Sequence, residues 1–556
     1  MLLRLITLAT NLVWFGAFDT LFRPMALAPR GPWMVFAPTV GGLIIGLMAR
    51  FGSEKIRGHG IPEAIEAILI GGSRMSPKVA ALKPLSSAVA IGTGGPFGAE
   101  GPIIMTGGAL GSLFAQFFHL SSAERKTLLV SGAAAGMTGV FGTPVAAILL
   151  SVELLLFEWR PRSFIPVATA SLVAFAWRPL FGGSGPLFPM SDLSPGMSVV
   201  LLSGFGIGLA SGLLATVLTK LLYRVEDIFD RLPIHWMWWP ALGGLVVGLG
   251  GLIEPRTLGV GYDLINDLLN GHLLLEIVLS ILLVKASIWL VALSSGTSGG
   301  VLAPLLIMGG ALGWLFGLAL PGPHGVWALL GMAAILGGTM RAPLTGAIFA
   351  VELTGNLHYL PALIAATSTA YAVTVLLLRR SMLTEKIARR GQHITREYAV
   401  DPYELMRVRD VMARKVDTLR ATMPVDEARQ LLERGFHRVY PVIDDAGRPI
   451  GAVSRADALR WQSQDIDAAD LVQDYAADLE LPVLHPDDVL LRALDLMLAT
   501  DQGRIVVVDP NSRALIGLLT RKDLLQVRAT TSAADRERQA YFRARRNEKA
   551  LVGAKL

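Results

Sequence analysis

The sequence predicts a mostly helical membrane domain made of two duplicated halves, followed by a pair of small α/β domains. Three observations support this prediction. The 556-residue chain is 52% hydrophobic and only 17% charged, with a mean hydropathy of +0.52, which is too apolar for an ordinary soluble protein. A segment of the apolar region repeats within it. Beyond about Arg380 the apolar stretches end and charged residues crowd the chain, so the two regions meet different solvents.

The apolar region before Arg380 is interrupted by glycine clusters. They are GTGGPFGAEGP, SSGTSGG and GGTMRAP, at 92–102, 294–300 and 337–343. Several of the resulting segments are shorter than the roughly 20 residues that a membrane-spanning helix needs. Such breaks are tolerated at membrane depth where the backbone lines a protected cavity, so they predict a transport site.

An internal repeat relates the two halves of this region. Residues 94–114 match residues 296–316 at a constant offset of 202, and GGALGSLF overlies GGALGWLF. Further along, TPVAAILLSVEL resembles APLTGAIFAVEL at an offset of 199, which gives Glu153 and Glu352 equivalent positions and favours a structural role for both. Duplicated halves with broken helices imply a pseudo-symmetric transporter whose ion site lies between the repeats.

The charged C-terminal part shows two similar units. Each contains a helical pattern, two β-rich runs separated by a polar turn (DDAGRP or DPNSRA), and a short helix. This arrangement predicts a tandem pair of α/β domains.

Four glycine-containing or polar segments stand at expected helix starts. They are GHGIPE at 58–63, GAEGP at 98–102, GGVLAP at 299–304 and RSMLTEKIARRG at 380–391. Free backbone N–H groups and the positive end of the helix dipole make such starts suitable for anions. We expect these neutral dipoles to hold the ion without a buried cation, because a buried lysine would bind a permeant anion too tightly.

The composition also excludes several classes of protein. The absence of cysteine rules out disulfides, thiol catalysis and cysteine-ligated metals. No nucleophile with its base, metal-ligand spacing or phosphate loop with a catalytic lysine stands in the sequence, so we expect no enzyme and no required cofactor. The formal charge of +6 discriminates little. The lipid bilayer is the expected environment, and no nucleic-acid partner is expected.

The ordered motifs resemble those of the CLC family of chloride channels and chloride/proton exchangers, over roughly residues 20–390. The family's GSGIPE, GREGP and GxFxP appear here as GHGIPE, GAEGP and GVLAP. The tail, at about 407–528, resembles a pair of CBS domains. The resemblance implies an all-α polytopic membrane domain of two inverted repeats, followed by an α/β tandem CBS domain pair. It further implies a homodimer in the cell inner membrane, with the CBS domains in the cytoplasm.

The resemblance also sets the expected domain bounds. These are a transport domain at 1–390 with repeat halves at roughly 30–190 and 195–385, a linker at 391–406, CBS domains at 407–465 and 471–528, and a charged tail at 529–556.

Glu100 matches the family's gating glutamate, whose carboxylate occupies an anion position when ionised and leaves it when protonated or displaced. Its structural alternative is a carboxylate at a helix N-terminus. The resemblance places the anion-binding groups at the helix starts, on His59, Gly60, Ile61, Ala99, Gly101, Val301, Leu302 and Leu383.

Four positions depart from the family pattern. His59 replaces the usual serine; it can bind the anion through its N–H, make transport depend on pH, or turn into helix packing. Leu383 replaces the anion-coordinating tyrosine and removes its hydroxyl. Leu154 replaces the inner glutamate that commonly relays protons, as in the channel branch. Ala99 replaces an arginine and removes a positive charge near the outer entrance.

The expected function is transport of a small inorganic anion, with chloride as the first candidate, by a passive or weakly coupled channel-like pathway gated by Glu100. One alternative is an anion/proton antiporter with an unconventional proton route, for which His59 is a candidate relay. Another is a carrier selective for a different anion such as bicarbonate or fluoride.

A third hypothesis, from another class, is a nucleotide-responsive sensor. The CBS signatures are GAVSRAD and GLLTRKD, in which Ser454, Asp457, Thr520 and Asp523 can hold an adenine nucleotide. The alternative is a purely structural or dimerising pair.

Overall fold

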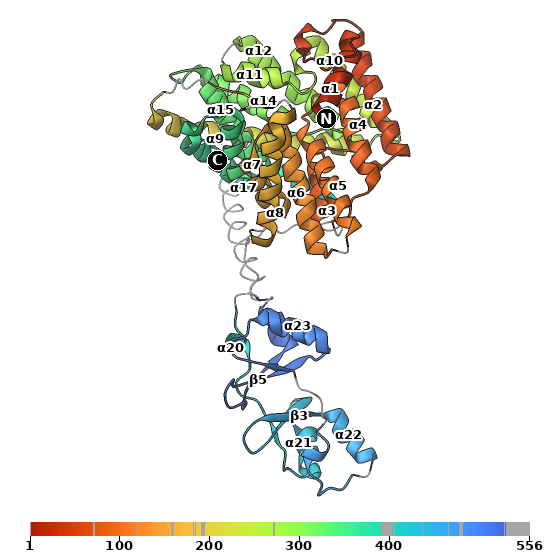
Figure 1. Ribbon diagram of the computed structural model, residues 1–556, viewed down its shortest axis with the longest axis vertical. Coiled ribbons are helices and arrows are strands. Elements are labelled where there is room, and N and C mark those ends of the chain that lie inside the picture. The colour runs from red at the N-terminus through yellow and green to blue at the C-terminus, as the bar shows by residue number, and fades with distance from the viewer. Residues whose placement is uncertain are drawn as a thin grey trace, which may run out of the picture. The chain divides into compact units, whose positions relative to one another are not determined.

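A computed structural model describes the chain as two compact units, Met1–Tyr398 and Ala399–Leu556 (Figure 1). The described residues are 2–527 and 529, except 70–72, 119, 157–158, 160, 182, 184, 191–194, 271–272, 391–402, 404–405, 436, 465 and 477–481. The predicted linker and the predicted charged tail therefore lie largely outside the described residues.

The first unit is a bundle of helices whose order repeats. Its first half contains α1 (Leu2–Thr10), α2 (Trp33–Phe51), α3 (Ile61–Leu69), α4 (Pro77–Gly92), α5 (Glu100–Phe117), α6 (Ser122–Phe141), α7 (Pro144–Leu150) and α8 (Pro161–Trp177). Its second half contains α9 (Met197–Asp230), α10 (Trp239–Ile253), α11 (Tyr262–Asn270), α12 (Leu275–Ser280), α13 (Ala286–Ser294), α14 (Leu302–Phe316), α15 (His324–Met340), α16 (Pro343–Thr354) and α17 (Leu360–Leu377). The unit ends with α18 (Met382–Arg389).

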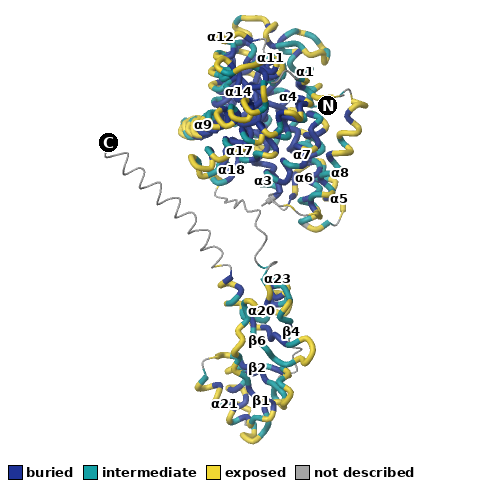
Figure 2. Tube along the Cα trace, turned by 90° about the vertical axis from the view of Figure 1, so that its left-hand side faces the viewer, coloured by how far each residue is buried: buried dark blue, intermediate teal, exposed yellow. Residues whose placement is uncertain are grey.

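Helix lengths agree with the prediction of broken spans. Among the described residues, six helical segments are long and apolar enough to cross a membrane: Trp33–Phe51, Pro161–Phe181, Met197–Asp230, Trp236–Ile253, Leu275–Ser294 and Leu357–Arg389. The apolar helices α14, α15 and α16 are shorter. Figure 2 shows buried residues gathered around α4 and α14, whereas α9 carries many exposed ones. The short helices thus form the interior, where the backbone at their ends is shielded from lipid.

Small residues let equivalent helices approach each other closely. A Cβ on Gly42 in α2 would lie 2.1 Å from the carbonyl oxygen of Pro240, and a Cβ on Gly244 in α10 would lie 2.1 Å from that of Pro38. The two contacts are equivalent, because each joins the same pair of repeat positions with the two halves exchanged. Only glycine permits this separation, so α2 and α10 form a pair about a local two-fold axis.

The repeated Val-Glu-Leu segments exchange carboxylates between the halves. Glu153 accepts hydrogen bonds from the N–H of Thr345 (2.8 Å) and from its hydroxyl (2.6 Å), at the start of α16. Glu352, in α16, accepts from the N–H groups of Val145 (3.0 Å) and Ala146 (2.8 Å), at the start of α7. Each half therefore supplies the N-terminal cap of a helix in the other, which agrees with the structural role predicted for both glutamates.

The second unit contains two copies of a small three-stranded sheet. The first copy has strands β1 (Leu419–Arg420), β2 (Val439–Ile443) and β3 (Pro449–Ser454), with helices α21 (Val425–Arg434) and α22 (Arg455–Ser463). The second has β4 (Val483–Leu484), β5 (Arg504–Val508) and β6 (Leu515–Thr520), with α23 (Leu490–Thr500). A short helix, α20 (Val408–Val411), precedes both. In each sheet the first strand runs parallel to the second, and the second pairs antiparallel with the third.

Candidate anion-binding site

Three of the predicted glycine segments meet at the centre of the first unit. Gly98 and Gly300 exchange two backbone hydrogen bonds, of 3.0 and 2.7 Å, although they lie in different halves of the chain. A Cβ on Gly101 would lie 1.8 Å from the carbonyl oxygen of His59. The structure thus brings GHGIPE, GAEGP and GGVLAP together, as the sequence predicts.

The Gly98–Gly300 pair also gives the orientation of the two halves. Equivalent residues that exchange both backbone bonds are related by a local two-fold axis, because an antiparallel pair looks the same from either strand. α5 begins two residues after Gly98, and α14 begins two residues after Gly300. The N-termini of two equivalent helices therefore converge on this axis, where their free N–H groups favour negative charge.

Glu100 places a carboxylate at this point. The residue is buried, with 1% of its surface exposed. A Cβ on Gly98 would lie 1.7 Å from its Oε2, and one on Gly300 would lie 2.8 Å away, so glycine at both positions makes room for the carboxylate. The N–H groups of Glu100 itself and of Ala303 face it. Neither carboxylate oxygen has a hydrogen bond of regular geometry to the described residues, so the group is held loosely by helix ends.

The other predicted anion-binding residues lie at or near the same helix starts. Ile61 begins α3, Ala99 directly precedes α5, and Leu302 begins α14, where Val301 directly precedes it. All four are buried. Their backbone amides, rather than their apolar side chains, are the groups that can act on an anion. Their binding role stays a prediction.

His59 lies in the turn before α3. Its side chain is 2% exposed, and its Nδ1 has no hydrogen-bond partner among the described residues. Lys386 from α18 and Glu63 from α3 are the charged groups that act on it most strongly. An unpaired ring nitrogen therefore remains for a ligand or a proton, and the role of His59 stays a prediction.

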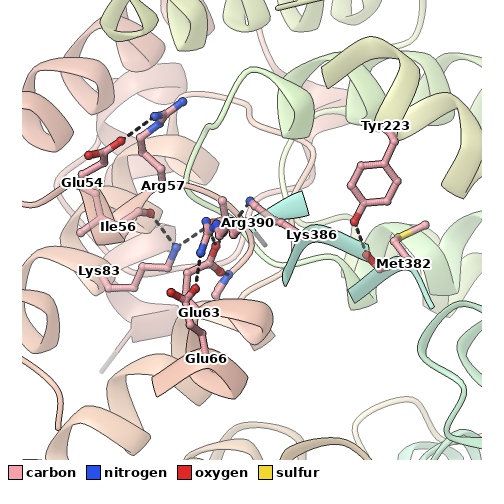
Figure 3. A network of polar contacts seen from close by, with 12 residues as sticks. Glu54, Ile56, Arg57, Glu63, Glu66, Lys83, Tyr223, Met382, Lys386 and Arg390 are labelled. Carbon is pink, nitrogen blue, oxygen red and sulfur yellow. Dashed lines mark hydrogen bonds and ion pairs between the residues drawn. The ribbon is translucent and has the colours of Figure 1, made fainter. Parts of the chain in front are cut away.

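A charged network closes the side of the site next to α18 (Figure 3). Glu63 accepts the N–H of Gly60 at 2.9 Å and forms ion pairs with Lys386 (3.5 Å) and Arg390 (3.2 Å). Arg390 also pairs with Glu66 at 2.5 Å. Lys386 in α18 and Arg390 just after it thus connect this end of the chain to α3 through ion pairs.

Leu383 lies in the first turn of α18 and is buried, with 1% of its surface exposed. A tyrosine does reach this turn from another helix: the hydroxyl of Tyr223 in α9 donates to the carbonyl of Met382 (Figure 3). That hydroxyl is already engaged. The loss of a free hydroxyl at position 383 is therefore not repaired by Tyr223.

Two fully buried lysines lie beside the glycine loops, where the motifs did not predict them. The Lys83 ammonium donates to the carbonyls of Ile56 and Gly58, at 2.8 Å each. The Lys285 ammonium donates to those of Thr257 (3.0 Å) and Gly259 (3.1 Å). Both side chains are 0% exposed. Each ammonium is engaged by backbone carbonyls, so anion binding by helix ends without a cation ligand stays a prediction.

The lysines could have been found from the repeat. Lys83 and Lys285 are separated by the same offset of 202 that relates the two glycine-rich segments. A charged residue that recurs at the repeat offset within apolar helices indicates a buried role in both halves. The glycine motifs alone do not reveal the buried role of these two lysines.

In the second unit, the four residues predicted to bind a nucleotide form helix caps. Asp457 accepts the N–H (2.8 Å) and hydroxyl (2.6 Å) of Ser454 at the start of α22. Asp523 accepts the same two groups of Thr520, at 2.8 and 2.6 Å. These capping boxes account for the residue types of the motif without a ligand. Nucleotide binding by this pair stays a prediction.

Comparison with known protein families agrees with both units. Residues 41–375 match the family described as voltage gated chloride channel. This chain belongs to that family. Residues 408–464 and 472–530 match the CBS domain. The chain is accordingly a multi-pass membrane protein of the anion-transporting CLC type, and not an enzyme, and the predicted fold of a helical CLC domain followed by a CBS pair is confirmed.

Curated relatives cover most of the membrane unit. A protein named as ClcB-like from Ralstonia nicotianae is 30% identical over 360 residues, which span 62% of this chain and 84% of the relative. The H(+)/Cl(-) exchange transporter ClcA of Salmonella paratyphi B is 33% identical over 332 residues, spanning 56% of this chain and 68% of the relative.

Solved structures share the fold at lower identity. A slow cyanobacterial Cl-/H+ antiporter aligns with a TM-score of 0.60 and 20% identity, covering 70% of this chain and 92% of the other. A eukaryotic CLC transporter aligns over 93% of both chains with a TM-score of 0.57 and 19% identity. The second alignment extends over the CLC and CBS regions together.

Proposed function

We propose that this protein exchanges a small anion, chloride, for protons across the cell inner membrane. The observation that carries the proposal is the buried carboxylate of Glu100 at the meeting point of α5 and α14. A carboxylate without a cation partner is costly in such a setting. It is stabilised either by the helix ends, which are also the anion's ligands, or by a proton. One group that competes with the anion and binds a proton can couple the two movements.

The relatives named as exchangers support exchange over the channel-like pathway that the sequence favours, whereas the Ralstonia nicotianae relative bears the name of a chloride channel protein. The Salmonella relative is named an exchange transporter for protons and chloride, and two of the structural neighbours are named proton antiporters. Antiport, the alternative mode that the sequence leaves open, is therefore the better supported one. Chloride is the anion named for the Salmonella relative, which is 33% identical, whereas fluoride is named for a structural neighbour that is 21% identical.

The proton route on the α18 side needs a group other than the usual glutamate. Leu154 is apolar and fully buried. His59 lies in the loop that contacts α5 and keeps an unpaired Nδ1. We propose that its imidazole passes protons between the α18 side and Glu100. The charged network of Glu63 and Lys386 beside it connects His59 with the aqueous mouth.

Basic residues at the end of α18 support a proposal for the orientation of the chain. The last turn of α18 carries Lys386 and Arg389, and Arg390 follows. Excess lysine and arginine marks cytoplasmic ends of membrane helices. We propose that α18 and the CBS pair that continues from it face the cytoplasm, and that the protein works as a homodimer, as the family resemblance implies.

Reconstituted vesicles test the proposal. Purified protein in liposomes is given an outward chloride gradient with no proton gradient, and the internal pH is followed. We expect protons to move uphill, driven by chloride, and expect Glu100→Gln to abolish this movement while chloride still passes. Chloride flux without any proton movement in the wild-type protein would reject exchange and restore the channel-like pathway.

The role of His59 is tested in the same vesicles. We expect His59→Ala to reduce proton movement at least about tenfold with a smaller loss of chloride flux, because a relay is removed but the helix ends remain. His59→Ser restores a hydroxyl without a titratable ring, so we expect it to reduce proton movement as much as His59→Ala does. Comparing chloride, fluoride, nitrate and bicarbonate in both variants checks the transported ion. Unchanged coupling in both variants would show that His59 is not the relay.

A further inference from the structure

A second glycine loop lies opposite the first. Residues 58–61 read Gly-His-Gly-Ile, and residues 259–262 read Gly-Val-Gly-Tyr at an offset of 201. Each loop leads into an equivalent helix, α3 or α11. A buried lysine binds the first carbonyl of each loop and the carbonyl two residues before it. Figure 1 shows α3 and α11 at opposite ends of the first unit. The two-fold relation therefore places the 259–262 loop on the far side of Glu100 from α18.

The second loop packs on α14 as the first packs on α5. A Cβ on Gly60 would lie 2.7 Å from the carbonyl oxygen of Gly101, in α5. A Cβ on Gly261 would lie 2.7 Å from Cδ1 of Ile307, in α14. Both loops thus lie against one of the two helices that converge at Glu100. The residue after each second glycine begins the next helix: Ile61 in one half and Tyr262 in the other.

Tyr262 brings a phenol where the equivalent Ile61 brings an alkyl group. Its ring contacts two aromatic rings edge-on, Phe141 at 6.3 Å and Phe188 at 5.8 Å between centroids. Its hydroxyl is buried and has no hydrogen-bond partner among the described residues. An orphaned buried hydroxyl is costly, so a natural one usually serves a ligand or a moving group.

Glu100 is the charged residue whose carboxylate acts electrostatically on this hydroxyl. The carboxylate itself has no regular hydrogen bond to the described residues. A donor without an acceptor and an acceptor without a donor therefore lie within electrostatic range of each other. A rotation that takes the Glu100 carboxylate away from the glycine pair would leave it in need of a new hydrogen-bond donor.

We propose that the Tyr262 hydroxyl donates a hydrogen bond to the Glu100 carboxylate when that side chain leaves the helix ends, and to the anion when it passes on the same side. This proposal rests on the proposed function and adds a positioning residue to it. The pathway then has its hydroxyl ligand on the side away from α18, whereas Leu383 offers none on the α18 side.

Other charged groups near the loop come from several parts of the chain. Arg23, which pairs with Asp19 at 2.7 Å, lines the same cavity as residues 259–263. Asp263 follows Tyr262 in α11, and Asp267 lies one turn later in the same helix. From η8 (Ile281–Lys285), the Lys285 ammonium reaches the loop and acts on Asp263. From α5, Glu100 is the charged group that acts on the Tyr262 hydroxyl. Since Asp263 and Lys285 are unchanged by substitution of Tyr262, a change in pH dependence reports on Glu100.

Removal of the hydroxyl alone is the test. Tyr262→Phe keeps the ring that contacts Phe141 and Phe188, and Tyr371→Phe, which removes the hydroxyl of a more exposed tyrosine in α17, is the control. Chloride flux is measured in vesicles as a function of pH on the side away from the CBS domains. A hydrogen bond to a charged group changes an equilibrium about tenfold or more, so we expect the midpoint of the pH profile to rise by about one unit. The rise follows because the ionised carboxylate loses a donor and holds its proton to higher pH.

The Glu100→Gln background separates this proposal from the proposed function. There the variant side chain cannot ionise, and we expect Tyr262→Phe to produce no further change in the pH profile. An unchanged midpoint for Tyr262→Phe in wild-type protein that still couples chloride to protons would overturn the role of Tyr262 and leave the exchange mechanism standing. A shift of equal size in the Glu100→Gln background would also overturn it, because the effect would not pass through Glu100.

Discussion

At the scale of single residues, the site depends on two glycines that make room for a buried carboxylate and on two lysines that bind buried carbonyls. Gly98 and Gly300 leave room for the carboxylate of Glu100, and Lys83 and Lys285 neutralise the carbonyls of the two glycine loops. Without the lysines, two buried carbonyls at each loop would face no donor. The amides of the same loops could then not be fixed toward the centre, because the backbone would turn to satisfy its carbonyls.

The lysines make a testable prediction. Lys83→Met and Lys285→Met each leave two buried carbonyls unpaired, which we expect to lower the free energy of unfolding by about 2 kcal/mol, at about 1 kcal/mol for each lost hydrogen bond. The thermal unfolding midpoint in detergent should fall by a few degrees for both variants. Lys78→Met, at an exposed lysine of α4, is the matched control and should change nothing. Equal stability of all three variants would show that the loops do not depend on the ammoniums.

At this scale the sequence predicted the helix starts and Glu100 better than the side chains that pack around them. Helix starts with glycine are visible as motifs, so Glu100 and the convergence of three segments could be predicted. Lys83 and Tyr262 could not be found in this way, because their importance depends on which backbone groups and side chains face them after folding. Only the repeat offset pointed to the lysines, and nothing in the sequence showed that the Tyr262 hydroxyl would be buried without a partner.

At the scale of elements, the two halves are joined by helix ends rather than by apolar contacts alone. Glu153 caps α16 and Glu352 caps α7, so the N-terminus of each helix is completed by the opposite half. The sequence match predicted the equivalence of these residues. It did not predict the exchange of caps, because an internal match shows which residues are equivalent but not whether they act within their own half or across to the other.

The exchanged caps predict equal effects in the two halves. Glu153→Ala leaves the N–H groups of Leu344 and Thr345 without this acceptor, and Glu352→Ala leaves those of Val145 and Ala146. We expect each change to destabilise the protein by about 1–2 kcal/mol, as for the loss of a helix cap. Glu153→Gln and Glu352→Gln keep an acceptor and should lose less. Glu276→Ala, at an exposed glutamate of α12, is the control for unfolding in detergent. A large effect in one half and none in the other would contradict the symmetric arrangement.

Two further elements could not be predicted from the sequence. The strands β1 and β4 contain two residues each, too few to show an alternating pattern, and they are strands only because β2 and β5 lie beside them. The longer strands and the helices of the second unit were predicted, because their runs of β-branched residues and their polar turns are local features.

At the scale of the whole molecule, a transport unit and a CBS unit are joined in one chain. The helix caps of α22 and of the helix that follows β6 use the side chains that the CBS signature offers for a nucleotide. A cap and a ligand can share a hydroxyl, because it has one donor and two acceptor positions. The structure of this unit is therefore compatible with either a regulatory or a dimerising role.

Nucleotide binding can be measured on the intact protein. If adenine nucleotides bind the CBS pair, ATP or AMP at about one hundred times its Kd should stabilise that unit by about 2.7 kcal/mol and raise its unfolding temperature. We expect this rise in the full chain and not in a chain lacking residues 400–556. No rise at millimolar ATP, AMP or ADP would leave the pair with a structural role and remove the sensor hypothesis.

The central claim is that one carboxylate, Glu100, joins anion and proton movement. The reversal potential of the purified protein in a planar bilayer tests it most directly, with chloride held equal on both sides and only the pH made different. We predict a reversal potential away from zero for the wild-type protein, and zero for Glu100→Gln, which retains chloride current. A wild-type reversal potential of zero would contradict this coupling, since the current would then be carried by the anion alone.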